Sequence, residues 1–194
     1  MGSFLNEIYN YIITLINSSV IFGPLLACLL IFLESILPIL PLFVFITIVF
    51  VAYGHIFGFI ISYILTCLGC IFAFYLCRKF LKNFFEKKIR KIDNLDNLMK
   101  KLDKIKLSSL VILIAIPFTP AFAINIAASL SKIQFKKFLF AIIIGKISLV
   151  TFWGYIGTSL LESLRNPKIL LVIISMLLIA FILSKIVTKK LEIE

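Results

Sequence analysis

The chain has 194 residues, of which 62% are apolar or aromatic and only 15% are charged. A soluble domain has about 45–50% apolar and about 25% charged residues, so a water-soluble enzyme and a disordered tail are both excluded. The charge is one-sided, with 20 Lys and Arg against 9 Asp and Glu, a net charge of +11. Basic loops on the cytoplasmic side of a membrane explain this excess better than nucleic-acid binding, for which no motif is present. We therefore expect an all-α integral membrane protein.

The first two apolar segments differ from ordinary membrane spans. Residues 4–17 are amphipathic and shorter than the roughly 20 residues that a span requires, so we expect an interfacial helix. Residues 20–53 are too long for one straight span and are interrupted by Pro38 and Pro41. Since each half is too short to cross, the sequence predicts a re-entrant helical hairpin that enters and leaves on the same side. An ordinary span kinked by proline is the alternative.

A turn is expected at 54–58, and the first full span follows at 59–77. The linker 78–106 resembles a soluble segment, with eleven Lys and Arg and four Asp and Glu. Its apolar residues recur at intervals of three or four positions: Phe85, Ile89, Ile92, Leu95, Met99, Leu102 and Ile105. This period predicts an amphipathic helix that lies on the membrane surface.

The second half of the chain repeats the pattern of the first half. Residues 107–131 form another apolar stretch, broken in its middle by Pro117 and Pro120. A full span is predicted at 138–160, and a C-terminal span at 169–187. The order of amphipathic helix, broken hairpin and full span therefore occurs twice.

A constant offset relates the two halves. The pattern x-P-x-x-P-x-F begins at Leu37 and again at Ile116, 79 residues later. We divide the single membrane domain, residues 1–194, into repeat 1 (4–81) and repeat 2 (83–160). The basic linker opens the second repeat, and the C-terminal helix follows it.

The positive-inside rule gives the two repeats opposite orientations. It assigns the basic linker and the C-terminus to the cytoplasm, so the second hairpin dips in from the cytoplasmic face and the first hairpin from the outer face. Such an inverted repeat is typical of secondary transporters, whose sites lie between the halves at broken helices. We expect a multi-pass protein of the inner or plasma membrane.

Two charged residues stand out within the apolar segments. Glu34 is four residues before Pro38, and an ionised carboxylate near the bilayer centre costs at least about 2.5–3.5 kcal/mol. It is predicted to exchange a proton or contact a headgroup, the alternative being a structural role beside the broken backbone. Lys146 is open to two interpretations: it extends to the cytoplasmic interface, or it pairs with Glu34 or holds a lipid phosphate.

The predicted path for substrate or protons combines these charges with the hairpin breaks and hydrogen-bonding groups: Glu34, Pro38, Pro41, Pro117, Thr119, Pro120, Asn125 and Lys146. Cys67-x-x-Cys70 lacks a second pair or a nearby His, so the cysteines are interpreted as free and buried. With no catalytic triad, phosphate loop or metal cluster in the sequence, we expect no enzyme activity, metal or cofactor. Small residues predict close helix contacts at Gly69, Ala73, Gly145, Gly154 and Gly157.

Motifs in both halves resemble the DedA family, also called the SNARE-associated or VTT-domain family. The first half contributes Phe32-Leu33-Glu34-Ser35-x-x-Pro38-x-x-Pro41, Gly54-x-x-x-Gly58 and Gly69-x-x-x-Ala73-x-Tyr75-x-Cys77-Arg78. The second half contributes Ile116-Pro117-Phe118-Thr119-Pro120-x-x-x-x-Asn125-x-Ala127-Ala128-Ser129, with Phe138 and Gly145. The resemblance covers about residues 20–160.

The resemblance implies opposed re-entrant hairpins and movement of lipids across the bilayer, often linked to the proton-motive force. It implies membrane lipids with anionic or polyprenyl phosphate headgroups as partners, among them undecaprenyl phosphate. Glu34 matches the hairpin acid of the family. Ala115 stands where many members have Arg, and Ser129 stands where Gly is usual. A transporter of a small solute or ion and a membrane scaffold are the alternatives, and homo-oligomerisation is left open.

Overall fold

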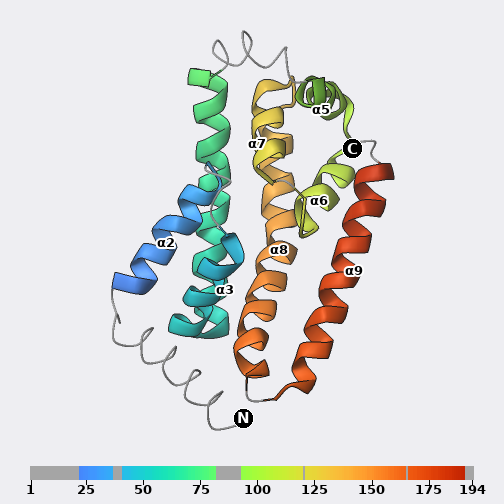
Figure 1. Ribbon diagram of the computed structural model, residues 1–194. Coiled ribbons are helices and arrows are strands. Elements are labelled where there is room, and N and C mark those ends of the chain that lie inside the picture. The colour runs from blue at the N-terminus through green and yellow to red at the C-terminus, as the bar shows by residue number, and fades with distance from the viewer. Residues whose placement is uncertain (1–21, 37–40, 82–92, 120, 165, 191–194) are drawn as a thin grey trace.

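The computed structural model describes residues 22–36, 41–81, 93–119, 121–164 and 166–190. All regular secondary structure in these ranges is helical (Figure 1). Three helical stretches are long and apolar enough to cross a membrane: Leu42–Lys79, Phe135–Ser163 and Lys168–Lys189. The prediction of an all-α membrane protein is therefore confirmed. The predicted interfacial helix at 4–17, Pro38, Pro120 and the linker segment 82–92 lie outside the described residues.

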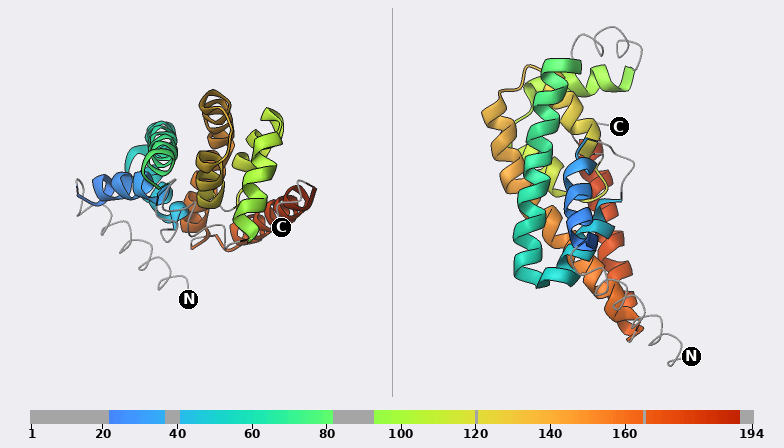
Figure 2. Two further views of the ribbon diagram at one scale, coloured as in Figure 1. Left: turned by 90° about the horizontal axis from the view of Figure 1, so that it is seen from above. Right: turned by 90° about the vertical axis from the view of Figure 1, so that its left-hand side faces the viewer.

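The first hairpin consists of α2 (Phe22–Glu34) and the first part of α3 (Leu42–Leu76). The chain reverses at Gly54 inside α3, and the second part of α3 runs along the hairpin to the other end of the molecule (Figures 1 and 2). Gly54 has φ 78° and ψ 174°, a backbone conformation that essentially only glycine adopts. The expected turn at 54–58 is therefore shorter than predicted, because one glycine makes the whole reversal and the helix resumes at His55. The π-helical turn η1 (Cys77–Leu81) ends this unit.

The second hairpin consists of α6 (Leu107–Ala115) and α7 (Ala121–Leu130), and it enters from the opposite end of the molecule (Figure 1). Its helices have 9 and 10 residues, and α8 (Phe135–Ser163) beside them has 29. At about 1.5 Å per residue, α6 and α7 extend only about a third of the length of α8. The first residue of α7 follows the first residue of α3 by 79 positions, which is the offset of the sequence repeat. The last helix, α9 (Lys168–Lys190), packs along α8.

Each hairpin has its own hydrophobic core. Around the first hairpin, the core is formed by α2, the first part of α3 and one residue of α8: Ala27, Ile31, Ile46, Val49, Phe50 and Val150. Around the second, residues of α5, α6, α7 and α8 surround Phe74 and Phe138, whose rings stack with centroids 4.7 Å apart. The two halves are joined by Tyr63, which packs against both cores and donates a hydrogen bond to the Ile143 carbonyl at 2.8 Å.

Glycines allow each hairpin to approach a long helix closely, as predicted from the small residues. A Cβ at Gly69 would lie 2.6 Å from the Phe32 carbonyl oxygen, and a Cβ at Gly145 would lie 2.9 Å from the Ile114 side chain. At Gly154 and Gly157, a Cβ would overlap Phe50 and Thr47 respectively. Small side chains are what such close helix packing needs inside a membrane protein.

The amphipathic helix of the basic linker differs from the prediction. In α5 (Asp93–Lys104), Leu102 is completely buried, and Ile105 just beyond the helix is 9% exposed. Both belong to the protein core around the second hairpin, and Met99 packs against it. The described part of this apolar face, Met99, Leu102 and Ile105, therefore contacts protein, and the side chains of the linker before Met99 lie outside the described residues. The apolar period was correctly identified, but it does not specify whether lipid or protein covers it.

Candidate functional site

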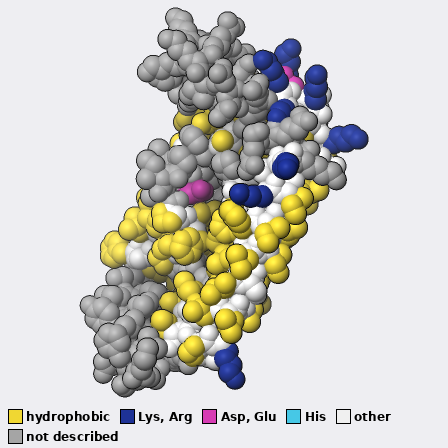
Figure 3. All heavy atoms as spheres, turned by 45° about the vertical axis from the view of Figure 1, so that its right-hand side comes forward, with side chains coloured by type: hydrophobic (Ala, Val, Ile, Leu, Met, Phe, Trp, Pro, Cys, Tyr) yellow, Lys and Arg dark blue, Asp and Glu magenta, His cyan; other side chains and the backbone are white. Residues whose placement is uncertain are grey.

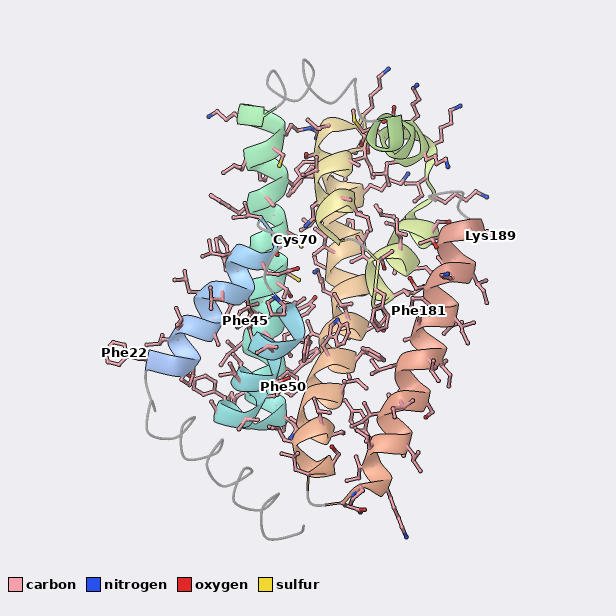
Figure 4. The ribbon with its side chains drawn as sticks, viewed as in Figure 1. Phe22, Phe45, Phe50, Cys70, Phe181 and Lys189 are labelled. Atoms are coloured by element: carbon pink, nitrogen blue, oxygen red, sulfur yellow. The ribbon has the colours of Figure 1, made fainter. Side chains whose placement is uncertain are left out.

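The last turn of α2 meets α7 and the second part of α3. The Asn125 amide nitrogen lies 3.5 Å from the Ser35 carbonyl oxygen and 3.5 Å from the Cys70 sulfur. The Cys70 sulfur in turn lies 3.7 Å from the Ser35 hydroxyl. Cys70 is well away from both ends of the molecule (Figure 4). Polar groups from both hairpins thus meet within the bundle, and Gly69 is what lets Ser35 approach α3.

Lys146 enters the same region from α8. Its side chain is 1% exposed, and its ammonium nitrogen has no hydrogen-bond partner among the described residues. It lines a cavity of about 20 Å³ together with residues of the second hairpin, among them Thr119 and Asn125. A cavity of this size holds about one water molecule. The interpretation that Lys146 extends to the interface is wrong, because its ammonium group is enclosed by protein.

Glu34 is half-buried in the last turn of α2. It lies within electrostatic reach of Lys146, and Cys67 on α3 lies in the same region. Four residues of the sequence prediction therefore lie near the end of α2 and the tip of the second hairpin: Glu34, Thr119, Asn125 and Lys146. An acid, a cation, an amide and a hydroxyl from different elements share one largely apolar region.

Cys67 and Cys70 are the members of this cluster that sequence reasoning missed, since it treated them as inert packing residues. All four cysteines are free thiols. The repeat itself carried a signal for one of them, because the 79-residue offset aligns Cys67 with Lys146. These two residues occupy matching places in the two repeats, and they lie in the same region of the bundle.

The described hairpin prolines have different surroundings. Pro41 is exposed at the start of α3, and Pro117 is buried directly before the tip of the second hairpin. At this tip Phe118 has φ 68°, an uncommon value for a residue other than glycine. The Thr119 hydroxyl donates a hydrogen bond to the Ile116 carbonyl and closes the turn. Local backbone strain of this kind costs roughly 1–3 kcal/mol and persists where surrounding contacts hold it.

Aromatic rings hold the strained tip. Phe118 packs edge-on against Trp153 of α8, with centroids 5.5 Å apart, and against Phe181 of α9 at 6.1 Å. Trp153 also contacts Phe43, near the start of α3, at 5.8 Å. The start of α3 and the tip of the second hairpin therefore share one aromatic contact on α8.

The arrangement offers charge and hydrogen bonds to a ligand. A lysine ammonium and an asparagine amide donate to anionic oxygens, and a glutamate can bind or release a proton. Within the described ranges, no group of three or more His, Cys, Asp and Glu side chains could hold a metal ion.

Comparison with known proteins identifies the family. The model of the VTT domain matches residues 12–159. The uncharacterized membrane protein YhjE of Bacillus subtilis is 32% identical over 146 residues, which cover 75% of this chain and 70% of that protein. No solved structure gives a significant match. The chain belongs to the VTT-domain, or DedA, family of membrane proteins.

Proposed function

We propose that this protein moves a phosphate-bearing membrane lipid, such as undecaprenyl phosphate or a phospholipid, between the two leaflets. The headgroup passes the meeting point of the hairpins, and the acyl or prenyl chains stay in the bilayer. The observation that carries the proposal is the Lys146 ammonium, which is buried without a hydrogen-bond partner among the described residues, beside the tip of the second hairpin. A buried charge whose hydrogen bonds are not satisfied is costly, and an anionic headgroup is a ligand that would offset the cost.

The proposal places the bundle in the inner or plasma membrane with its basic end in the cytoplasm. In this orientation both half-length hairpins are re-entrant, the first from outside and the second from inside. Broken helices at membrane depth are tolerated where protein or a polar cavity surrounds them, and transporters bind substrates at such breaks. The basic residues concentrated at one end support this orientation through the positive-inside rule (Figure 3).

The tips must separate during transport, because a cavity of about 20 Å³ is far smaller than a phosphate headgroup. The contacts between the hairpins favour such movement. The Asn125 amide reaches the Ser35 carbonyl oxygen only at 3.5 Å, longer than the roughly 2.9–3.0 Å of a strong N–H···O bond. Each hairpin is held much more tightly to a long helix at the glycine contacts. Weak tip contacts and firm flanking contacts are what a repeated opening needs.

The experiment is a lipid-translocation assay in proteoliposomes. Headgroup-labelled phospholipid should change leaflets with the wild-type protein, and Glu34→Gln and Lys146→Met should each reduce the rate at least tenfold. Entrapped phosphate and sodium ions are followed in parallel. Transport of such a solute without lipid movement would favour the secondary-transporter alternative. If both the Glu34→Gln and the Glu34→Ala variants kept wild-type transport activity, Glu34 would have no role in the mechanism.

A disulfide between the second hairpin and α3 tests the required movement. Asn125→Cys would introduce a thiol beside the native Cys70, to which the asparagine amide is 3.5 Å away. Oxidation should stop translocation, and a reductant should restore it. The matched control carries Cys70→Ser as well and should be insensitive to oxidation. Full activity of the cross-linked protein would show that the tip does not move.

A further inference from the structure

A second basic region lies at the end of the molecule, outside the hairpin junction. Here α5 and the beginning of α6 border a cavity of about 580 Å³. Its lining residues are mostly lysines: Lys100, Lys101, Leu102, Lys104, Ile105, Lys106 and Ser109. No Asp or Glu of the described chain is among them. We refer to this feature as the lysine cavity.

The fold of α5 explains why lysines surround the cavity. Leu102 and Ile105 are buried in the core of the second hairpin, which turns the opposite, lysine-bearing face of the helix outward. The nearest acid in the sequence, Asp103, accepts a hydrogen bond from the Lys132 backbone amide at 2.6 Å instead of lining the cavity. The Lys137 ammonium donates to the Ile105 carbonyl and fixes the adjoining segment. The basic face is thus held by the protein core and does not depend on insertion into lipid.

We propose that the lysine cavity binds the phosphate headgroup of an anionic membrane lipid. Charge complementarity is the first argument, since lysines near a membrane surface attract anionic lipid with about 1 kcal/mol each. The ammonium groups of Lys101, Lys104 and Lys106 also supply donors, with no carboxylate among the described residues of the lining. The position of α6 is the second argument. Leu107 and Ile112, which follow Lys106 on α6, are 39% and 46% exposed and offer apolar surface for the lipid chains.

The surface at this end agrees with a lipid rather than a soluble phosphate compound. Lysine and arginine side chains gather at one end of the molecule, beyond the exposed hydrophobic side chains (Figure 3). Since the exposed Leu107 directly follows Lys106, a headgroup in the lysine cavity would lie next to apolar surface. A soluble phosphorylated molecule would use the charge but leave this apolar border unused.

The test measures lipid association with the full chain in nanodiscs. The fraction of spin-labelled phosphatidylglycerol that is immobilised by the protein is compared with that of spin-labelled phosphatidylcholine. The double variant Lys101→Gln/Lys104→Gln should lose the preference for phosphatidylglycerol by about thirtyfold. Lys101→Arg/Lys104→Arg should keep most of it. The matched control is Lys185→Gln/Lys189→Gln, which removes the same charge from the same end on α9 and should change the preference less than twofold.

Three results would overturn the inference. An equal loss in both Gln pairs would indicate a general basic surface, and no loss in either pair would exclude the cavity. Displacement of the lipid by inorganic phosphate at matched concentration would indicate a soluble phosphorylated ligand. Circular dichroism and gel filtration monitor folding. If the double variant does not fold, the single variant Lys104→Gln replaces it, with an expected loss of about fivefold. Glu34→Gln should retain this binding, so the site and the proposed translocation can fail independently.

Discussion

At the scale of single residues, Lys146 is a charged side chain in an enclosed site that water does not reach freely. Its ammonium group is enclosed, and no described residue accepts a hydrogen bond from it. A buried charge without a hydrogen-bond partner carries a desolvation cost that an apolar side chain of similar length does not. We expect Lys146→Met to raise the free energy of unfolding by ~1 kcal/mol while translocation falls at least tenfold. Denaturant unfolding in detergent and the liposome assay measure the two effects.

The control for this prediction is Lys136→Met, because Lys136 is on the same helix and exposed. It should leave both stability and transport nearly unchanged. If Lys146→Met lowered stability together with activity, the lysine would be a structural residue with a partner, and the central argument for a headgroup site would fail.

At the same scale, the close contacts of Gly69 lead to a prediction about packing. A Cβ there would lie 2.6 Å from the Phe32 carbonyl and 2.7 Å from the Ser35 hydroxyl. Overpacking of this kind typically costs about 1–3 kcal/mol, so Gly69→Ala should lower the unfolding free energy by that amount. It should also push the end of α2 away from Cys70 and speed the reaction of that thiol with maleimide. Leu68→Ala, on the neighbouring exposed position, is the control; equal effects of both changes would refute the packing argument.

At the scale of elements, the sequence predicts the hairpins because their signals are local. Pro41 marks the start of α3, and Pro117 marks the tip of the second hairpin, both through missing backbone donors and a fixed φ. The contacts of α5 were not predictable, because an apolar stripe does not identify what covers it. The burial of Lys146 could not be predicted from the sequence, for a similar reason. Its place along α8 follows from the sequence, whereas its burial depends on α6 and the tip that pack around it.

The reversal inside α3 gives a prediction for an element. Gly54 has a Gly-only backbone conformation, yet a Cβ there would meet no atom within 4 Å. Gly54→Ala should therefore lower stability by about 1–3 kcal/mol through backbone strain alone. Thermal unfolding in detergent is the measurement, with His55→Ala as the adjacent exposed control. Unchanged stability would mean that another residue makes the reversal.

At the scale of the whole molecule, the two hairpin cores and the 79-residue offset describe one pseudo-symmetric protein. Each hairpin packs into its own cluster of buried residues, and each cluster also takes residues from the other half, Val150 in the first and Phe74 in the second. Tyr63 packs against both clusters and donates a hydrogen bond to the Ile143 carbonyl. The hairpin junction lies between these cores. A polar site where two repeats meet is the arrangement in which secondary transporters bind their substrates.

Opposite insertion of the two halves makes a topological prediction. His55 is exposed at the reversal of α3, and Asn166 is exposed between α8 and α9 at the same end of the molecule (Figure 1). Lys136 is exposed near the start of α8, at the basic end. In intact cells, His55→Cys and Asn166→Cys should react with a membrane-impermeant maleimide. Lys136→Cys should react only after permeabilisation, because the basic end is expected in the cytoplasm.

The native protein is the background control, since Cys67, Cys70 and Cys77 are buried and Cys28 is half-buried. Labelling of His55→Cys only from the cytoplasm would place both hairpins on one side, and the inverted arrangement would have to be abandoned.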